Sequence, residues 1–112
     1  MTRAAATFVV ALAATVPTPA QTAGIRAAIA DDPRTCCGRG TYRVVDVRVS
    51  SVAASFAAAT VRPDNRKRDG AYVLLWHGTK RWVVIDAGTD FLGCGLIPGA
   101  VRKDLFGTMA CR

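Results

Sequence analysis

The sequence predicts an α+β domain in which an N-terminal helix packs on a four-stranded antiparallel β-meander and a short, disulfide-tied helix ends the chain. Two observations predict the sheet. Tyr72–Trp76 and Arg81–Ile85 are rich in aromatic and β-branched residues and are separated by a polar break that contains Gly78, which is the pattern of a β-hairpin. Tyr42–Val49 alternates between apolar and polar residues, as a half-buried strand does.

The first twenty residues are typical of a secretory signal. A positively charged start is followed by Ala4–Val16, an uncharged run rich in alanine and valine, and then by a break with small residues, Pro17-Thr18-Pro19-Ala20. We expect cleavage after Ala20, with Ala23 as the second choice. The apolar run is shorter than the ~20 residues that a membrane span needs, and no later stretch is longer. The sequence therefore predicts one secreted or envelope-associated domain, residues 21–112, with no transmembrane span.

The first helix is expected to follow this leader. Thr22 is a suitable N-cap, and Ile25 and Ile29 are four residues apart, so they lie on one face of a helix. The segment Asp31-Asp32-Pro33 ends the helix, because proline cannot continue it. A helix this short is not stable alone, so we expect its isoleucine face to pack on the sheet.

The first two strands differ in how clearly the sequence indicates them. In Tyr42–Val49 the alternation places Val45, Val47 and Val49 on one face and Asp46, Arg48 and Ser50 on the other. The next segment, Val52–Val61, is rich in alanine, and its intrinsic propensity favours a helix. Its position between two strands with short connections favours a strand, which is the interpretation we choose. A polar turn, Arg62–Gly70, leads from this strand into the hairpin.

The last helix is expected to start near Pro98, since proline suits the first turn of a helix. Val101 and Leu105 are four residues apart and share a face. Gly107 is a suitable C-cap. In outline the whole arrangement is similar to cystatin-like folds, a likeness of fold that does not transfer a function.

Four cysteines in an exported chain predict disulfide bonds. We favour a bridge between Cys94 and Cys111, which bracket the last helix, because it would close a loop of about 18 residues and stabilise the fold by ~3 kcal/mol. Cys36 and Cys37 are adjacent, and a bridge between neighbours forms a strained ring. Two alternatives stay open: one of these two bonds Cys94 and the other Cys111, or one or both remain free for an intermolecular bond or thiol chemistry.

The residues that could carry catalysis or a metal form no recognisable constellation. The cysteine spacing lacks the paired knuckles of a zinc site, even with His77 as a fourth ligand. His77 is the one histidine, placed at the hairpin turn, where we expect it to be solvated. Among the aspartates, Asp86 interrupts an apolar strand, and we expect it to accept hydrogen bonds from amides near Gly88 and Thr89 rather than to pair with Asp90 in catalysis. We predict no enzyme, no metal and no cofactor.

The charge balance favours acidic partners. The chain contains 15 Lys and Arg against 8 Asp and Glu, a formal net charge of +7, and loss of residues 1–20 would remove only Arg3 from this total. The densest cationic segment is the turn after the second strand, and its candidate residues for binding an anion or a partner are Arg62, Arg66, Lys67 and Arg68. The turn lacks the interleaved aromatic residues that stack on bases, so we predict no specific nucleic acid. The alternative is a solvated turn that only adds solubility.

The last 40 residues or so resemble small exported proteins of actinobacteria. In those proteins the second strand of a hairpin has the pattern "W-x-V-V-x-x-G-[ST]", and it is followed by "G-C", then by "[VI]-P-x-x-V-x-x-D-L" and a terminal cysteine. The matching positions here are Trp82, Gly88, Thr89, Cys94, Pro98, Val101, Asp104, Leu105 and Cys111. The resemblance implies export, an α+β sheet domain and a Cys94–Cys111 bridge, and it transfers no catalytic residue. The vicinal pair Cys36-Cys37 departs from this pattern.

The sequence as a whole predicts a non-enzymatic, secreted or envelope-associated basic protein that binds an anionic envelope component or a protein partner. One alternative is a secreted inhibitor of a protease or another hydrolase, which would present the loop Thr89–Pro98 to an enzyme cleft. Another alternative is a small thiol-dependent enzyme, which would need a free cysteine.

Overall fold

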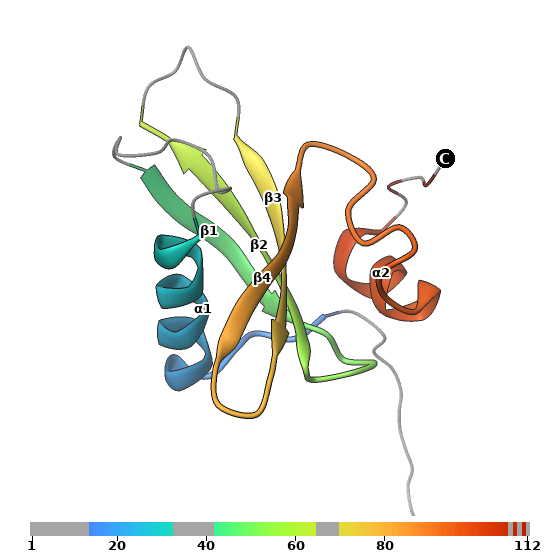
Figure 1. The fold of residues 1–112 in the computed structure, drawn as a ribbon, viewed down its shortest axis with the longest axis horizontal. Helices are drawn as coiled ribbons and strands as arrows, with labels where there is room; N and C mark the ends of the chain where they lie inside the picture. The colour runs from blue at the N-terminus through green and yellow to red at the C-terminus, as the bar shows by residue number, and fades with distance from the viewer. Residues whose placement is uncertain (1–13, 33–41, 65–69, 108, 110, 112) are drawn as a thin grey trace, which may run out of the picture.

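The computed structural model describes residues 14–32, 42–64, 70–107, 109 and 111. It has the predicted α+β fold: a helix, four antiparallel strands in the order β1-β2-β3-β4, and a short second helix (Figure 1). The elements are α1 (Pro19–Asp31), β1 (Tyr42–Val49), β2 (Phe56–Pro63), β3 (Ala71–His77), β4 (Trp82–Gly88) and α2 (Gly99–Phe106). The two helices lie on opposite faces of the sheet, so the domain has three layers (Figure 1).

Helix α1 covers one face of the sheet through the two isoleucines that the sequence indicated. Ile25 and Ile29 are both fully buried, and they pack on Val73 and Leu75 of β3 and on Trp82 of β4. The expected start of the helix was wrong by one turn. Thr18, not Thr22, is the N-cap: its hydroxyl accepts a hydrogen bond from the Gln21 amide, and the Gln21 side chain accepts one from the Thr18 amide. This reciprocal capping box satisfies two amides that would otherwise lack partners.

The segment before α1 is attached to the end of the sheet. Thr15 and Val49 exchange two backbone hydrogen bonds, with N···O distances of 2.8 and 3.0 Å. Ala14 packs against the cluster on the opposite face from α1. The expected cleavage point after Ala20 thus lies in the first turn of α1, and cleavage there stays a prediction. Within the described ranges, neither helix is long and apolar enough to cross a membrane.

Strand β1 has the predicted bounds, and the predicted faces are correct after the bulge but wrong before it. The pairing with β2 shifts register between Val45 and Arg48, where a β-bulge places Asp46 at φ 53°. Because a bulge adds one residue to the strand, the alternation reverses across it. Val49 is therefore buried on the α1 side with the partly buried Val47, as predicted, whereas before the bulge Val44, and not Val45, is buried there.

Strand β2 confirms the choice of a strand over a helix for the alanine-rich segment. It starts at Phe56, later than expected, and runs to Pro63. Its alanines are buried on both faces: Ala57 and Ala59 face α1, and Ala58 faces α2. Small side chains suit a central strand that is covered by a helix on each side. The hairpin of β3 and β4 is also confirmed, with both strands longer than expected.

Helix α2 starts after Pro98 and ends at Gly107, as predicted, and buries Val101, Leu105 and Phe106 against Ala58 and Leu74 of the sheet. The Cys94–Cys111 disulfide is present, with a Cα–Cα distance of 5.7 Å, and it ties the chain end to the loop before α2. Cys36 and Cys37 lie outside the described residues.

Candidate functional site

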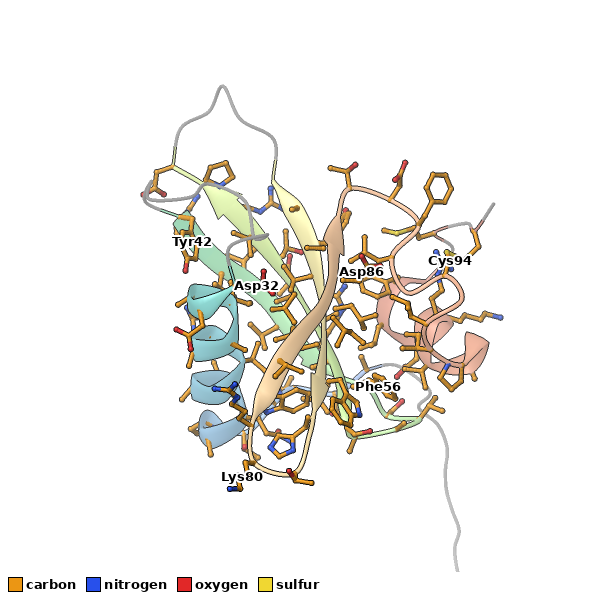
Figure 2. The ribbon with its side chains drawn as sticks, in the orientation of Figure 1. Asp32, Tyr42, Phe56, Lys80, Asp86 and Cys94 are labelled. Atoms are coloured by element: carbon orange, nitrogen blue, oxygen red, sulfur yellow. A yellow bond between two sulfur atoms is a disulfide. The ribbon has the colours of Figure 1, made fainter. Side chains whose placement is uncertain are left out.

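The loops around α2 are held by side-chain hydrogen bonds. Asp86 of β4 accepts hydrogen bonds from the Ala87 and Gly93 amides, both at 2.9 Å (Figure 2). Asp104 of α2 accepts three, from the hydroxyl of Ser50 and from the amide and hydroxyl of Ser51. The structural role expected for Asp86 is confirmed, although its loop partner is Gly93. Since both of its carboxylate oxygens already bind amides, Asp86 is occupied in bracing the loop.

The remaining candidates for chemistry are dispersed. His77 is exposed at the end of β3, and its ring contacts Trp82 edge-on, with 5.1 Å between the ring centroids. The two cysteines that the structure describes are joined to each other. In the described part of the chain, no three His, Cys, Asp or Glu side chains are grouped so that they could hold a metal ion.

The cationic residues are more informative, because the sheet places three arginines on one face. Arg62 is exposed near the end of β2 and lies directly opposite Arg43 of β1. Side chains two residues apart on a strand share a face, so Arg62 lies on the same face as Ala58 and therefore on the α2 side. Arg66, Lys67 and Arg68 follow Arg62 in the sequence but lie outside the described residues.

The pairing of Arg43 with Arg62 is electrostatically unfavourable. Like charges that are directly opposite on neighbouring strands destabilise a sheet. Within the described residues, Arg43 Nε pairs with Asp64 Oδ1 at 3.8 Å, and the two side chains are 71% and 48% exposed. A pair this exposed contributes at most ~1 kcal/mol. The register thus places two arginines opposite each other on the α2 side of the sheet.

The third arginine, Arg48, is held in place between the sheet and α2. Its Nε donates to the Leu105 carbonyl at 2.9 Å, and its Nη1 donates to the Asp46 carbonyl at 2.7 Å. Its guanidinium also lies over the Phe106 ring, 5.9 Å from the centroid. Burial lowers the pKa of Arg48, and the opposing electrostatic effects of Asp46 and Tyr72 offset this only in part. The site therefore holds a fixed positive charge.

An aromatic residue lies on the same side of the sheet as these arginines. Tyr72 of β3 is paired with Thr60 of β2, on the α2 side of the sheet, and is 36% exposed. Tyr72 raises the pKa of Arg48 electrostatically, and the register places Thr60, its partner, two residues from Ala58, the partner of Arg48. We call the surface formed by Arg43, Arg48, Arg62 and Tyr72 the arginine face. Of these four residues, the sequence had indicated only Arg62. The other three are separated along the chain, and the strand register brings them to the same side of the sheet.

Comparisons of this chain with protein families, with curated proteins and with solved structures found no match.

Proposed function

We propose that this chain is a non-enzymatic, exported protein that binds an anionic component of the cell envelope through the arginine face. The observation that carries the proposal is the direct cross-strand pairing of Arg43 with Arg62. This arrangement costs stability in the absence of a ligand, and a polyanion that contacts both guanidiniums would remove the repulsion.

The neighbouring residues support the same ligand class. Arg48 contributes a guanidinium fixed by two hydrogen bonds, and Tyr72 contributes a partly exposed aromatic side chain on the same side of the sheet. The sequence continues from Arg62 into the turn with Arg66, Lys67 and Arg68, so further cations follow within a few residues. Repeated phosphates or carboxylates along a polymer match a row of guanidiniums, because each anionic group can accept two hydrogen bonds from one arginine.

The inhibitor alternative depends on the loop Thr89–Pro98. This loop is coiled into turns: the Cys94 amide donates to the Phe91 carbonyl, and the Leu96 and Ile97 amides both donate to Gly93. The segment presents no extended stretch for pairing with another strand. We therefore retain the anion-binding proposal alone.

The proposal is tested by the adsorption of the full chain to immobilised poly(glycerol phosphate) over a series of salt concentrations. The double variant Arg43→Ala/Arg62→Ala is compared with Arg26→Ala/Lys103→Ala, which removes the same net charge from exposed positions on the two helices. If each arginine neutralises one phosphate, we expect the first variant to lower the slope of log K against log salt by about 1.4–1.8, using the ~0.7–0.9 per contact known for nucleic acids. Equal losses in both variants would show that net charge, and not the arginine face, governs adsorption.

The triple variant Arg66→Ala/Lys67→Ala/Arg68→Ala tests the turn separately. We expect a further loss of adsorption that weakens at high salt, since phosphate contacts are screened. Unchanged adsorption would remove the turn from the site and leave the residues of the sheet.

A further inference from the structure

A groove on the other side of the sheet lies between α1 and the start of β4. It has a volume of about 710 Å³. One wall is the flank of α1, with Ala20, Gly24 and Ala27, and the other wall and floor are formed by residues 81–84 at the hairpin end of β4. This groove shares no residue with the arginine face.

The middle of the α1 flank that lines the groove carries only small side chains, between Gln21 near the start of the helix and Asp31 near its end. At Gly24 the helix approaches the Trp82 ring so closely that an added Cβ would lie 2.9 Å from Trp82 Cδ1. Ala20 and Ala27, about one turn to either side, are exposed, so the space beside them is open. The floor is apolar, because Trp82 and Val84 form it.

Trp82 lines this groove, and its main-chain polar groups point away from β3. In an antiparallel pair, directly opposed residues alternate between those that hydrogen-bond to each other and those that do not. Gly78 N–H donates to the Arg81 carbonyl, and His77 N–H donates away from β4, to Ser55. His77 and Trp82 are therefore a non-hydrogen-bonded pair, and the Trp82 N–H and C=O point away from β3. In the described sheet β4 is an edge strand, so these groups face outward.

The outer edge of β4 can form main-chain hydrogen bonds with a bound strand over only a short stretch. The Ala87 amide is taken by the Asp86 carboxylate, Val84 already has a partner, and a register shift at Leu74 and Leu75 breaks the ladder. A bound strand would thus share main-chain hydrogen bonds with Trp82 and would depend on its termini for further contacts.

The two ends of the groove carry opposite charges. Lys80 and Arg81 lie at the hairpin end, beside the N-terminus of α1, where the helix dipole also favours an anion. Asp31 lies at the other end, in the last turn of α1. Figure 2 shows Asp32, the next residue in the chain, at one end of the helix and Lys80 at the opposite end. From Ala20 to Asp31 the helix rises ~16 Å, which is the length of about five extended residues.

We propose that this groove binds the C-terminal five residues or so of another polypeptide as an extended strand antiparallel to β4. The antiparallel direction places the free carboxylate at Lys80 and Arg81 and an amine or basic side chain at Asp31. The parallel direction would place the positively charged N-terminus of the peptide against Lys80 and Arg81. Charge therefore favours the antiparallel direction. Main-chain pairing with Trp82 supplies the register, and alternate side chains of the peptide lie on the apolar floor. This site does not rest on the proposed anion-binding function.

The test uses a random pentapeptide library attached through its N-terminus, in one version with free C-terminal carboxylates and in another with C-terminal amides. The full chain is expected to enrich members of the carboxylate library, with affinities about tenfold above those of the matching amides. Failure to enrich any member of either library would overturn the proposal. Equal binding of an enriched peptide and its amide would overturn the assignment of the carboxylate end.

Two pairs of variants locate the binding. Ala27→Trp fills the groove from an exposed helix position, and Ala30→Trp adds the same side chain at an exposed position that does not line it. We expect about tenfold weaker binding for the first and no change for the second. Lys80→Glu/Arg81→Glu should weaken the binding similarly, whereas Arg26→Glu/Lys103→Glu should not. If binding instead survives Ala27→Trp and is lost in Arg43→Ala/Arg62→Ala, the peptide binds the arginine face and the groove proposal is wrong.

Discussion

Replacement of Gly24 by alanine tests the closest approach between α1 and the sheet. In an ordinary helix interior, Gly→Ala stabilises a protein by ~1 kcal/mol, because alanine has the higher helix propensity. Here the new Cβ would lie 2.9 Å from Cδ1 and 3.6 Å from Nε1 of Trp82. Trp82 is only 7% exposed and packs within the core under α1, so its ring has little room to move. Overpacking of this kind costs ~1–3 kcal/mol. The net expectation is that Gly24→Ala lowers the free energy of unfolding by about 1 kcal/mol.

The assay is urea unfolding followed by tryptophan fluorescence, with thermal unfolding as a second measurement. A loss of ~1 kcal/mol corresponds to a Tm lower by ~4–8 °C in a domain of this size. The control is Ala23→Gly, the reverse exchange at the adjacent exposed position of α1, which should also destabilise by ~1 kcal/mol through propensity alone. Opposite substitutions at neighbouring positions would then both destabilise. A Gly24→Ala variant that is more stable than the parent chain would refute the close packing of α1 on Trp82.

Three further predictions concern the region around α2. Replacing Cys94 and Cys111 together by serine should lower the free energy of unfolding by ~3 kcal/mol, since the bridge spans 17 residues; an unchanged urea midpoint would contradict this. Asp104→Ala removes the acceptor of three hydrogen bonds, one from Ser50, which is 2% exposed, and should cost ~1–3 kcal/mol in urea unfolding, whereas the exposed control Asp90→Ala should be neutral. Arg48→Lys keeps the charge but loses the fork that binds both Asp46 and Leu105, so we expect a loss of ~1–3 kcal/mol and faster amide exchange in α2; parental exchange rates would count against this role.

The fold was predictable where local chemistry determined it. The hairpin, the isoleucine face of α1 and the second helix between Pro98 and Gly107 all follow from residue type and spacing, and the structure has each of them. The Cys94–Cys111 bridge was favoured over two alternatives because it closes a loop around α2, and the structure has it. These features need no knowledge of long-range contacts, and so sequence reasoning reached them.

The errors occurred where a distant contact overrides a local pattern. In β1 the valines alternate regularly, yet the bulge at Val45–Arg48 reverses the faces, and Asp46 adopts a positive φ that few residues other than glycine accept. Arg48 explains the bulge physically, since its side chain bonds the Asp46 carbonyl on one side and the Leu105 carbonyl of α2 on the other. Nothing within residues 42–49 signals a partner 57 residues away.

The candidate site was only partly predictable for the same reason. Arg62 stood out because it precedes a run of cations in one turn. Arg43 joins it only through the β1–β2 register, and that register depends on strand ends that sequence fixes poorly. The groove was not predictable from the sequence, because its walls come from a helix and a strand edge that are far apart in the chain. Their separation is set by the contact between Gly24 and Trp82.

The positions of the two surfaces make the two proposals independent. The arginine face lies on the α2 side of the sheet, and the groove lies between α1 and the edge of β4. Substitutions at Arg43 and Arg62 leave every groove residue intact, and Ala27→Trp leaves the arginine face intact. Because the sheet separates the sites, occupancy of one does not sterically block the other. If both sites bind, one chain can hold a polyanion and a polypeptide C-terminus at the same time, and adsorption to poly(glycerol phosphate) should then be unaffected by a saturating concentration of the best-enriched pentapeptide.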